Sequence, residues 1–242
     1  MSVFRARALV LRRAAFREHD LKVTLLLEND VCLEALAPSG QRSQRRFTAG
    51  LSPLCLYDLG WSESRAGARL EDAQCLQGWP GLSKRLGPQS AALACTGVIA
   101  AVAGPAPSQR VLFALLLELY ETLSAPDADA LAATVRFVFE ALDVTGHGAV
   151  LDRCARCDRP APAGVTVTLA ADAGGVVCRS CGGGGFRMTA SQRAALDALL
   201  RGAGGAIGPA HYDLAAALLG GVNAAAAEAL ARSRPLIVSD GA

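Results

Sequence analysis

Cys154-Ala155-Arg156-Cys157 and Cys178-Arg179-Ser180-Cys181 are two C-x-x-C pairs separated by twenty residues. Each such pair forms a tight turn, here called a knuckle, that presents two sulfurs to one metal ion, and four-thiolate zinc sites have this spacing. Four thiolates fill the tetrahedral shell of the ion and leave no position for an activated water. The pattern therefore predicts one structural zinc ion, with the ligands Cys154, Cys157, Cys178 and Cys181.

The segment between the two pairs is typical of a hairpin. Residues 165–169 are β-branched and alternate, Gly174 and Gly175 offer turn positions, and Val176-Val177 resumes an extended run. We therefore expect a zinc ribbon over residues 150–186. Other interpretations are two disulfides, reduced free thiols, or redox-active pairs as in thioredoxin-like proteins. A redox pair requires a βαβ context and a lowered thiol pKa, and neither knuckle is followed by a helix start.

The composition is that of a globular protein. The 242 residues, 52% of them apolar, are enough for one large domain or a few small ones. The first sixteen residues lack a signal-peptide pattern, and the longest low-charge stretch, residues 91–103, is too short to span a bilayer. We expect a cytoplasmic protein with no membrane segment, in which thiols stay reduced. The remaining cysteines are scattered singly among apolar residues, as buried thiols are: Cys32, Cys55, Cys75 and Cys95.

The first eighty residues have the pattern of a small β-barrel. Short apolar or alternating runs, separated by turn residues, predict five strands within this segment. Five short strands suit the OB-fold, a barrel whose face and loops bind nucleic acids. We therefore predict an OB-fold DNA-binding domain over residues 1–80. The expected strands are residues 8–11, 22–27, 31–36, 54–59 and 68–74, with a turn at 28–30.

Positive charge is concentrated at the N-terminal end of the chain. Residues 1–50 carry nine Arg or Lys against five acidic residues, a local net charge of +4. Within the loop at residues 39–46, three arginines follow one another without an acid between them, which suits phosphate contact, although such a run is also typical of a solvated loop. Four aromatic residues could stack on bases, but in so small a barrel they more often form the core: Phe16, Phe47, Tyr57 and Trp61. The candidate DNA contacts are Arg12, Arg13, Lys22, Arg42, Arg45 and Arg46.

Beyond Gly78-Trp79-Pro80-Gly81 the periodicity becomes helical. We predict an α+β chain in which residues 81–242 form a helical domain that contains the ribbon. The last expected helix is interrupted by Gly220-Gly221, and Arg232-Ser233-Arg234 with a short hydrophobic tail ends the chain. The expected helices are residues 89–103, which end at Gly104–Pro107, a second from Ser108, a third from Pro126 to Gly146, and then 192–200 and 212–231.

The order of barrel, helices, inserted ribbon and further helices resembles RecO, a family of bacterial recombination mediators. The resemblance covers most of the chain and rests on several short motifs. Two turns differ from the family pattern, Glu28-Asn29-Asp30 and Ala37-Pro38-Ser39, so we expect weaker DNA binding than is usual in the family. The motifs are Arg17–Asp20 with Val23–Leu26, Glu34–Ala37 with Arg42-Ser43 and Leu51–Pro53, Val135–Leu142 with Gly146, Gly174–Cys178, and Arg232–Arg234.

The resemblance implies a non-enzymatic protein of the nucleoid. Such a protein binds single- and double-stranded DNA, anneals complementary strands and helps to load RecA on coated single strands, with RecR and RecF as further partners. It also binds the C-terminal tail of single-stranded DNA-binding protein. Arg136 is the residue that the family pattern assigns to the carboxylate of that tail, because a guanidinium can bind a carboxylate bidentately. The other interpretation of Arg136 is an exposed helix arginine.

Other classes of protein remain as alternatives. For an enzyme, the sequence lacks a G-K phosphate loop, a G-x-S-x-G elbow and an H-E-x-x-H motif, and His19, His147 and His211 lie far apart. A zinc-ribbon protein that binds RNA or takes part in transcription shares the barrel, the basic loop and the zinc. A purely structural interaction protein is the third alternative.

Overall fold

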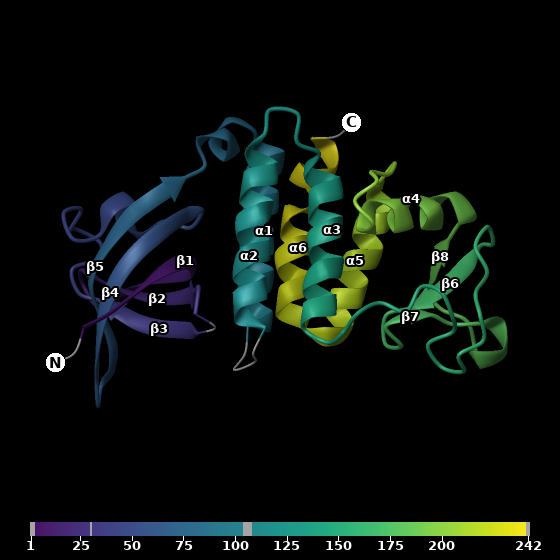
Figure 1. Ribbon diagram of the computed structural model, residues 1–242, viewed down its shortest axis with the longest axis horizontal. Helices are drawn as coiled ribbons and strands as arrows, with labels where there is room; N and C mark the ends of the chain where they lie inside the picture. The colour runs from purple at the N-terminus through teal and green to yellow at the C-terminus, as the bar shows by residue number, and fades with distance from the viewer. Residues whose placement is uncertain (1–2, 30, 104–107, 241–242) are drawn as a thin grey trace.

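The computed structural model describes residues 3–29, 31–103 and 108–240, so Asp30 of the expected turn and the expected helix end at Gly104–Pro107 lie outside the described residues. The chain is elongated, with a barrel at one end, a helical bundle in the middle and a small sheet at the other end (Figure 1). None of the helices in the described ranges combines the length and the apolar character needed to cross a membrane.

The N-terminal part is a closed barrel of five strands, as predicted, with the strand order β1-β2-β3-β5-β4. Antiparallel pairs join all neighbours except β3 and β5, whose parallel pairing closes the barrel. This is the topology of an OB-fold. The strands are β1 (Val3–Phe16), β2 (Asp20–Leu27), β3 (Cys32–Ala37), β4 (Cys55–Ser64) and β5 (Gly67–Gly78), and a short 3-10 helix, η1 (Thr48–Leu51), precedes β4.

Strand β1 is longer than the apolar run that predicted it. The register with β2 shifts between Val10 and Arg12, so Leu11 is the extra residue of a bulge. Before the bulge, Ala8 and Val10 are fully buried in the barrel core. Beyond it the strand continues to Phe16 with exposed side chains, which is why hydrophobicity alone gave too short a strand.

The helical bundle contains two helices where the sequence predicted one at the end of the chain. The expected helix over residues 212–231 is divided at Asn223, whose side chain caps the second helix by accepting a hydrogen bond from the Ala226 N–H. Residues 232–234 and the hydrophobic tail belong to this second helix. The helices are α1 (Leu86–Val102), α2 (Gln109–Ser124), α3 (Ala130–Val144), α4 (Ala190–Leu200), α5 (Pro209–Val222) and α6 (Ala224–Ser239), with the 3-10 turn η2 (Pro80–Lys84) before α1.

The barrel packs directly on the helices. The ring of Trp79, just after β5, meets Tyr120 of α2 edge to face, with ring centroids 4.9 Å apart. Four leucines on the outside of the barrel belong to the same buried hydrophobic cluster as the helical core: Leu9, Leu11, Leu26 and Leu56. Because this contact is apolar and buried, it holds the barrel in place against α1 and α2.

The four-cysteine segment forms a three-stranded sheet of order β7-β6-β8. Val167, Leu169 and Met188 of this sheet are buried in the helical core, so the segment is attached to the bundle by its apolar face. At Gly175 a Cβ atom would lie 2.2 Å from the Val150 carbonyl oxygen, so only glycine fits there. The strands are β6 (Val167–Ala170), β7 (Gly175–Val176) and β8 (Phe186–Met188), with the 3-10 turn η3 (Arg179–Cys181) in the second knuckle.

Candidate metal centre and nucleic-acid interface

The two knuckles bring the four predicted cysteine ligands together. The Sγ atoms of Cys154, Cys157, Cys178 and Cys181 all lie within 4.8 Å of one another, and those of Cys157 and Cys178 are 3.7 Å apart. A tetrahedral ion with metal–sulfur bonds of about 2.3 Å requires sulfurs about 3.8 Å apart. The donor set therefore fits a metal ion. All cysteines of the chain are free thiols, and 3.7 Å is far longer than a disulfide bond of about 2.05 Å.

Backbone donors prepare the first knuckle for a metal. The backbone N–H of Cys178 donates to the Sγ of Cys154 at 3.4 Å and lowers the pKa of the Cys154 thiol to about 6. In the opposite direction, the side chain of Cys157 raises the pKa of Cys181 to about 12, because neighbouring sulfurs do not all ionise without a cation between them. A metal supplies that positive charge and stabilises the thiolate at each position.

The basic loop lies beside the turn between β1 and β2. The Gln41 backbone N–H donates to the His19 carbonyl at 3.0 Å, and the Ser39 backbone N–H donates to Asp20 Oδ1 at 2.8 Å. These bonds fix one end of the loop to the barrel. The loop is therefore an ordered surface with arginines on it.

The three loop arginines do not play the same role. Arg42 and Arg45 are exposed, and within the described ranges neither guanidinium takes part in a hydrogen bond or an ion pair. Arg46 is turned back into the loop, where its Nη2 donates to the Pro38 carbonyl at 2.6 Å and its guanidinium lies 5.1 Å from the centre of the Phe47 ring. Two of the three cations are thus presented to solvent and the third holds the loop.

The other predicted DNA contacts lie on β1 and β2. Arg12 is exposed, and its guanidinium forms no hydrogen bond or ion pair with any described residue. Arg13 donates to the Gly50 carbonyl at 2.7 Å, which ties β1 to η1. Lys22 is paired with Glu34 at 2.8 Å and is therefore partly neutralised.

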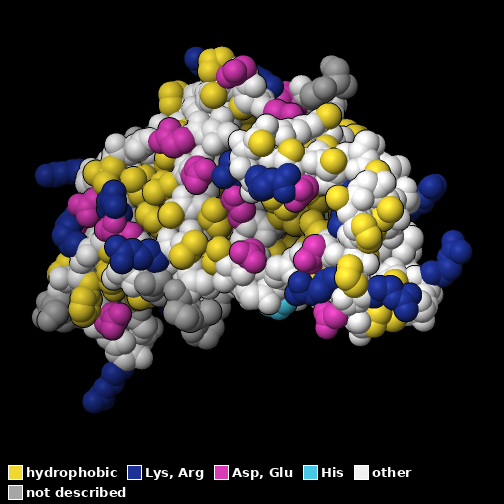
Figure 2. All heavy atoms as spheres, turned by 45° about the vertical axis from the view of Figure 1, so that its right-hand side comes forward, with side chains coloured by type: hydrophobic (Ala, Val, Ile, Leu, Met, Phe, Trp, Pro, Cys, Tyr) yellow, Lys and Arg dark blue, Asp and Glu magenta, His cyan; other side chains and the backbone are white. Residues whose placement is uncertain are grey.

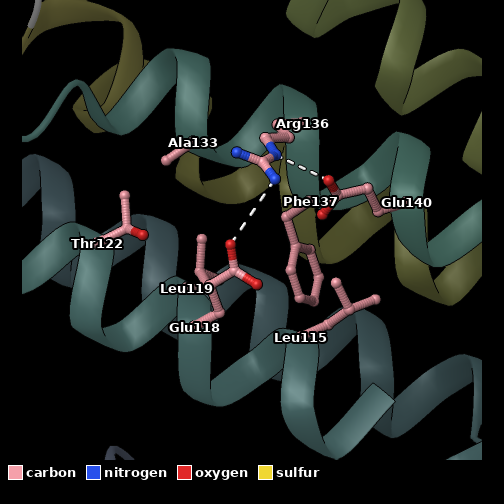
Figure 3. A pocket seen from close by; sticks show the side chains of 8 residues that line it. All are labelled: Leu115, Glu118, Leu119, Thr122, Ala133, Arg136, Phe137 and Glu140. Atoms are coloured by element: carbon pink, nitrogen blue, oxygen red, sulfur yellow. Dashed lines mark hydrogen bonds and ion pairs between the residues drawn. The ribbon is translucent and has the colours of Figure 1, made fainter. Parts of the chain in front are cut away.

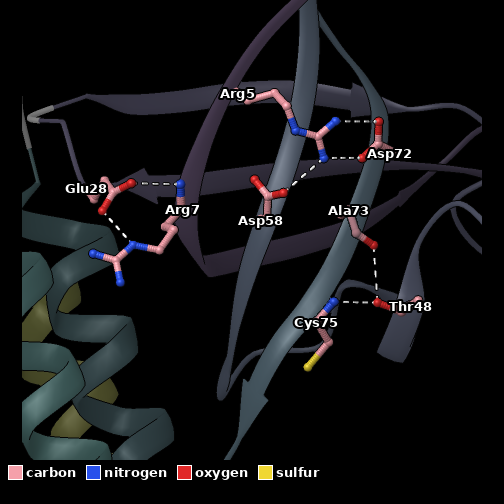
Figure 4. A network of polar contacts seen from close by, with 8 residues as sticks. All are labelled: Arg5, Arg7, Glu28, Thr48, Asp58, Asp72, Ala73 and Cys75. Atoms are coloured by element: carbon pink, nitrogen blue, oxygen red, sulfur yellow. Dashed lines mark hydrogen bonds and ion pairs between the residues drawn. The ribbon is translucent and has the colours of Figure 1, made fainter.

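Two arginines of β1 are matched by acids. Figure 4 shows Arg5 between Asp58, at 3.1 Å, and Asp72, at 2.9 Å, and Arg7 beside Glu28 at 2.6 Å. On the face of the molecule in Figure 2, basic and acidic side chains are likewise interspersed. Arg12, Arg42 and Arg45 are exposed and form no ion pair within the described ranges, and the same holds for Arg17, Arg65 and Arg69 of the barrel.

Of the four aromatic residues that the sequence singled out, only one is exposed. Phe47 and Tyr57 are fully buried and Trp61 is 6% exposed, whereas Phe16 is 41% exposed at the end of β1. The expectation of core aromatics holds for the first three. Sequence periodicity did not distinguish Phe16 from them, because the bulge at Leu11 reverses which residues of β1 face outward.

Arg136 lies in a groove between α2 and α3 (Figure 3). Leu115, Leu119 and Phe137 give the groove an apolar wall. The Arg136 Nε donates to Glu140 at 2.7 Å, and its Nη2 lies 3.7 Å from Glu118. The guanidinium thus lies beside an apolar surface with two carboxylates as its present partners.

These features define a class: an OB-fold protein with unmatched arginines on a barrel loop, joined to a helical body that carries a four-cysteine metal-binding segment. The chain matches the family description "Recombination protein O N terminal" over residues 1–79 and "Recombination protein O C terminal" over residues 88–232. The chain belongs to the RecO family.

Individual relatives agree with this assignment. The chain is 28% identical over 181 residues to a protein named DNA repair protein RecO from Rubrobacter xylanophilus, covering 75% of this chain and 72% of the relative. It is 33% identical over 201 residues to a protein of the same name from Anaeromyxobacter sp. strain K, covering 79% of this chain and 76% of the relative. A third relative so named, from Frankia casuarinae, is 30% identical over 184 residues.

Proposed function

We propose that this chain is a DNA repair and recombination mediator that binds single- and double-stranded DNA with its barrel and anneals complementary strands. The observation that carries the proposal is the pair of exposed, unmatched guanidiniums of Arg42 and Arg45 on a loop that is hydrogen-bonded to the barrel. Arginines contact phosphates in any sequence, so such a surface accepts any strand.

Annealing needs no covalent step. Two single strands repel each other through their phosphates, and a protein that neutralises part of this charge lowers the repulsion that opposes pairing. The chain contributes positively charged side chains on an ordered backbone, and the candidates are Arg12, Arg42 and Arg45. Arg13 and Lys22 support this surface through Gly50 and Glu34.

We assign zinc to the four-cysteine site. Four thiolates in a tetrahedral arrangement suit this ion and fill its shell, so the role is structural. The site holds the two knuckles together, and the sheet beside it is buried against the helices. Zinc therefore supports the shape of the end of the molecule farthest from the barrel (Figure 1).

For the groove at Arg136 we propose the C-terminal tail of single-stranded DNA-binding protein as the ligand. An apolar wall beside a guanidinium suits a peptide that ends in an apolar residue and a free carboxylate. To bind Arg136, that carboxylate must compete with Glu118 and Glu140. Membership of the RecO family supports RecR, RecF and RecA as further proposed partners. We propose that the chain helps to load RecA on single strands coated with single-stranded DNA-binding protein.

Salt dependence of DNA binding tests the proposal. Replacing both Arg42 and Arg45 with Ala removes two phosphate contacts, so the slope of log K against log salt should flatten by roughly 1.4 on single strands and roughly 1.8 on duplex. Arg201→Ala, at the C-cap of α4, changes an exposed arginine paired with Asp197; it is the control and should leave the slope unchanged. A wild-type affinity that does not fall as salt is raised, or a double variant with the wild-type slope, contradicts the barrel loop as the DNA site.

A further inference from the structure

Phe16 is a large aromatic side chain without a place in the core. It is 41% exposed and, within the described part of the chain, is not packed against any of the three buried hydrophobic clusters. Exposing a phenylalanine ring costs free energy, so a ring beside charged groups is a candidate for contact with a ligand.

The ring is held by its neighbour. The guanidinium of Arg17 lies 5.2 Å from the centre of the Phe16 ring, a cation–π arrangement. Arg17 has a φ of 54°, in the left-handed region, as the tight turn into β2 requires. One face of the phenyl ring is therefore covered by a cation, and the side chain is restrained before any ligand binds.

Phe16 shares a face of the barrel with Arg12 and Lys22, two of the predicted DNA contacts. Residues opposite each other in paired strands lie on the same face, and the register pairs Phe16 with Asp20, Ala14 with Lys22 and Arg12 with Thr24. Phe16 and Arg12 are thus on one face, about 13 Å apart along the strand.

The basic loop reaches the same place. Gln41, next to Arg42, donates from its side chain to the Asp20 carbonyl at 3.0 Å, and Asp20 is the partner of Phe16 in the sheet. Of the two acids of this turn, Asp20 accepts a hydrogen bond from the Ser39 N–H, whereas the Glu18 carboxylate is exposed and lies 3.5 Å from His19 Nε2.

We propose that Phe16, restrained by Arg17, is a base-stacking residue that gives this surface a preference for single-stranded over double-stranded DNA. The proposal rests on the proposed function and names the residue that discriminates between its two ligands. Phosphates are accessible in both forms, so the arginines bind both. Unpaired bases present their flat faces only in a single strand, so an aromatic ring stabilises only that complex.

The experiment compares Phe16→Ala with Phe4→Ala. Phe4 lies on the same strand, is 45% exposed and stacks on Trp61 with ring centroids 5.5 Å apart, so it matches Phe16 in type and exposure. Binding is measured on an oligothymidine strand and on a duplex of equal length. Phe16→Ala should weaken binding to oligothymidine by at least about fivefold and leave duplex binding unchanged, Phe4→Ala should change neither, and Phe16→Tyr should restore the single-strand affinity.

The outcomes separate the inference from the proposed function. If Phe16→Ala leaves both affinities unchanged, or lowers both equally, the ring does not stack on bases and the inference fails, while the arginine surface stands. If the wild-type protein binds neither oligothymidine nor duplex, the proposed function itself fails.

Discussion

Arg46 and Arg45 are neighbours in the same loop, yet their surroundings differ. Arg46 contacts the Pro38 carbonyl and the Phe47 ring, whereas the Arg45 side chain is exposed. Pro38 stands at one of the two turns that depart from the family pattern. It lacks an N–H, but its carbonyl accepts the bond from Arg46, so the substituted turn still contributes to the structure of the loop.

Arg46→Ala should therefore lower stability where Arg45→Ala does not. The loss of a hydrogen bond to a charged donor and of a cation–π contact is expected to cost about 1–2 kcal/mol. Arg45→Ala should stay within about 0.5 kcal/mol of the wild type, as exposed substitutions usually do. Urea unfolding of both variants measures the difference, and equal stabilities would contradict the role assigned to Arg46.

At the groove between α2 and α3, Arg136→Ala should weaken binding of a peptide with an acidic, apolar C-terminus by about tenfold or more, because a charge-assisted contact is lost. Glu118→Gln should strengthen the same binding, since Glu118 competes for the guanidinium at 3.7 Å. Fluorescence anisotropy of a labelled peptide measures both, with Arg201→Ala as the control. Unchanged affinity in Arg136→Ala would show that the peptide binds elsewhere or not at all.

The role of a single residue was predictable from sequence where the residue type fixes its chemistry. The four cysteines were predicted as metal ligands, because two C-x-x-C pairs have few other uses. The difference between the exposed Arg45 and the loop-binding Arg46 was not predictable, because it depends on which side chain the loop turns toward Pro38 and Phe47. The exposure of Phe16 was hidden for a similar reason, since it follows from a bulge five residues earlier.

At the scale of elements, the knuckles have little packing of their own, so we expect their fold to depend on the proposed metal ion. The cluster beneath them contains only Cys154, Ala170 and Val177 as buried residues. So small an apolar cluster contributes little, and metal binding supplies folding free energy in such a segment.

Replacing both Cys154 and Cys157 with Ser should abolish zinc binding and lower stability by more than about 2 kcal/mol. Cys32→Ser, a partly buried cysteine on β3, is the control and should keep the metal. Metal content and melting temperature are measured on the same preparations. A double variant with no metal and the wild-type melting temperature would show that the site does not support the fold.

Helices and strands with a clear hydrophobic periodicity were predicted well, but the residues at which they begin and end were not. The five strands of the barrel follow from alternation and turn residues. The division between α5 and α6 was placed at Gly220-Gly221, but the helix continues through both glycines and ends at Val222, because the cap that starts α6 is the side chain of Asn223. Pro235 lies inside α6, where the sequence pattern indicated an end to the helix.

For the whole molecule, the main consequence of the fold is a fixed arrangement of three parts: barrel, helices and four-cysteine sheet (Figure 1). The domain boundary near residue 80 remains a prediction, although β5 ends at Gly78.

The leucines that join the barrel to the helices could not be assigned from sequence, because Leu9 faces outward while its neighbours Ala8 and Val10 face inward in one continuous apolar run. Because the three parts are held in a fixed arrangement, we expect the proposed DNA site at one end and the proposed peptide groove in the middle to act together on one coated strand.

The most direct test of the account is annealing of complementary single strands that are coated with single-stranded DNA-binding protein. The chain is expected to accelerate annealing of coated strands, and to lose this effect when the coating protein lacks its C-terminal tail or when Arg42 and Arg45 are both replaced with Ala. If the coat blocks the chain, as it would block a general RNA- or single-strand-binding protein, the assignment as a mediator is contradicted.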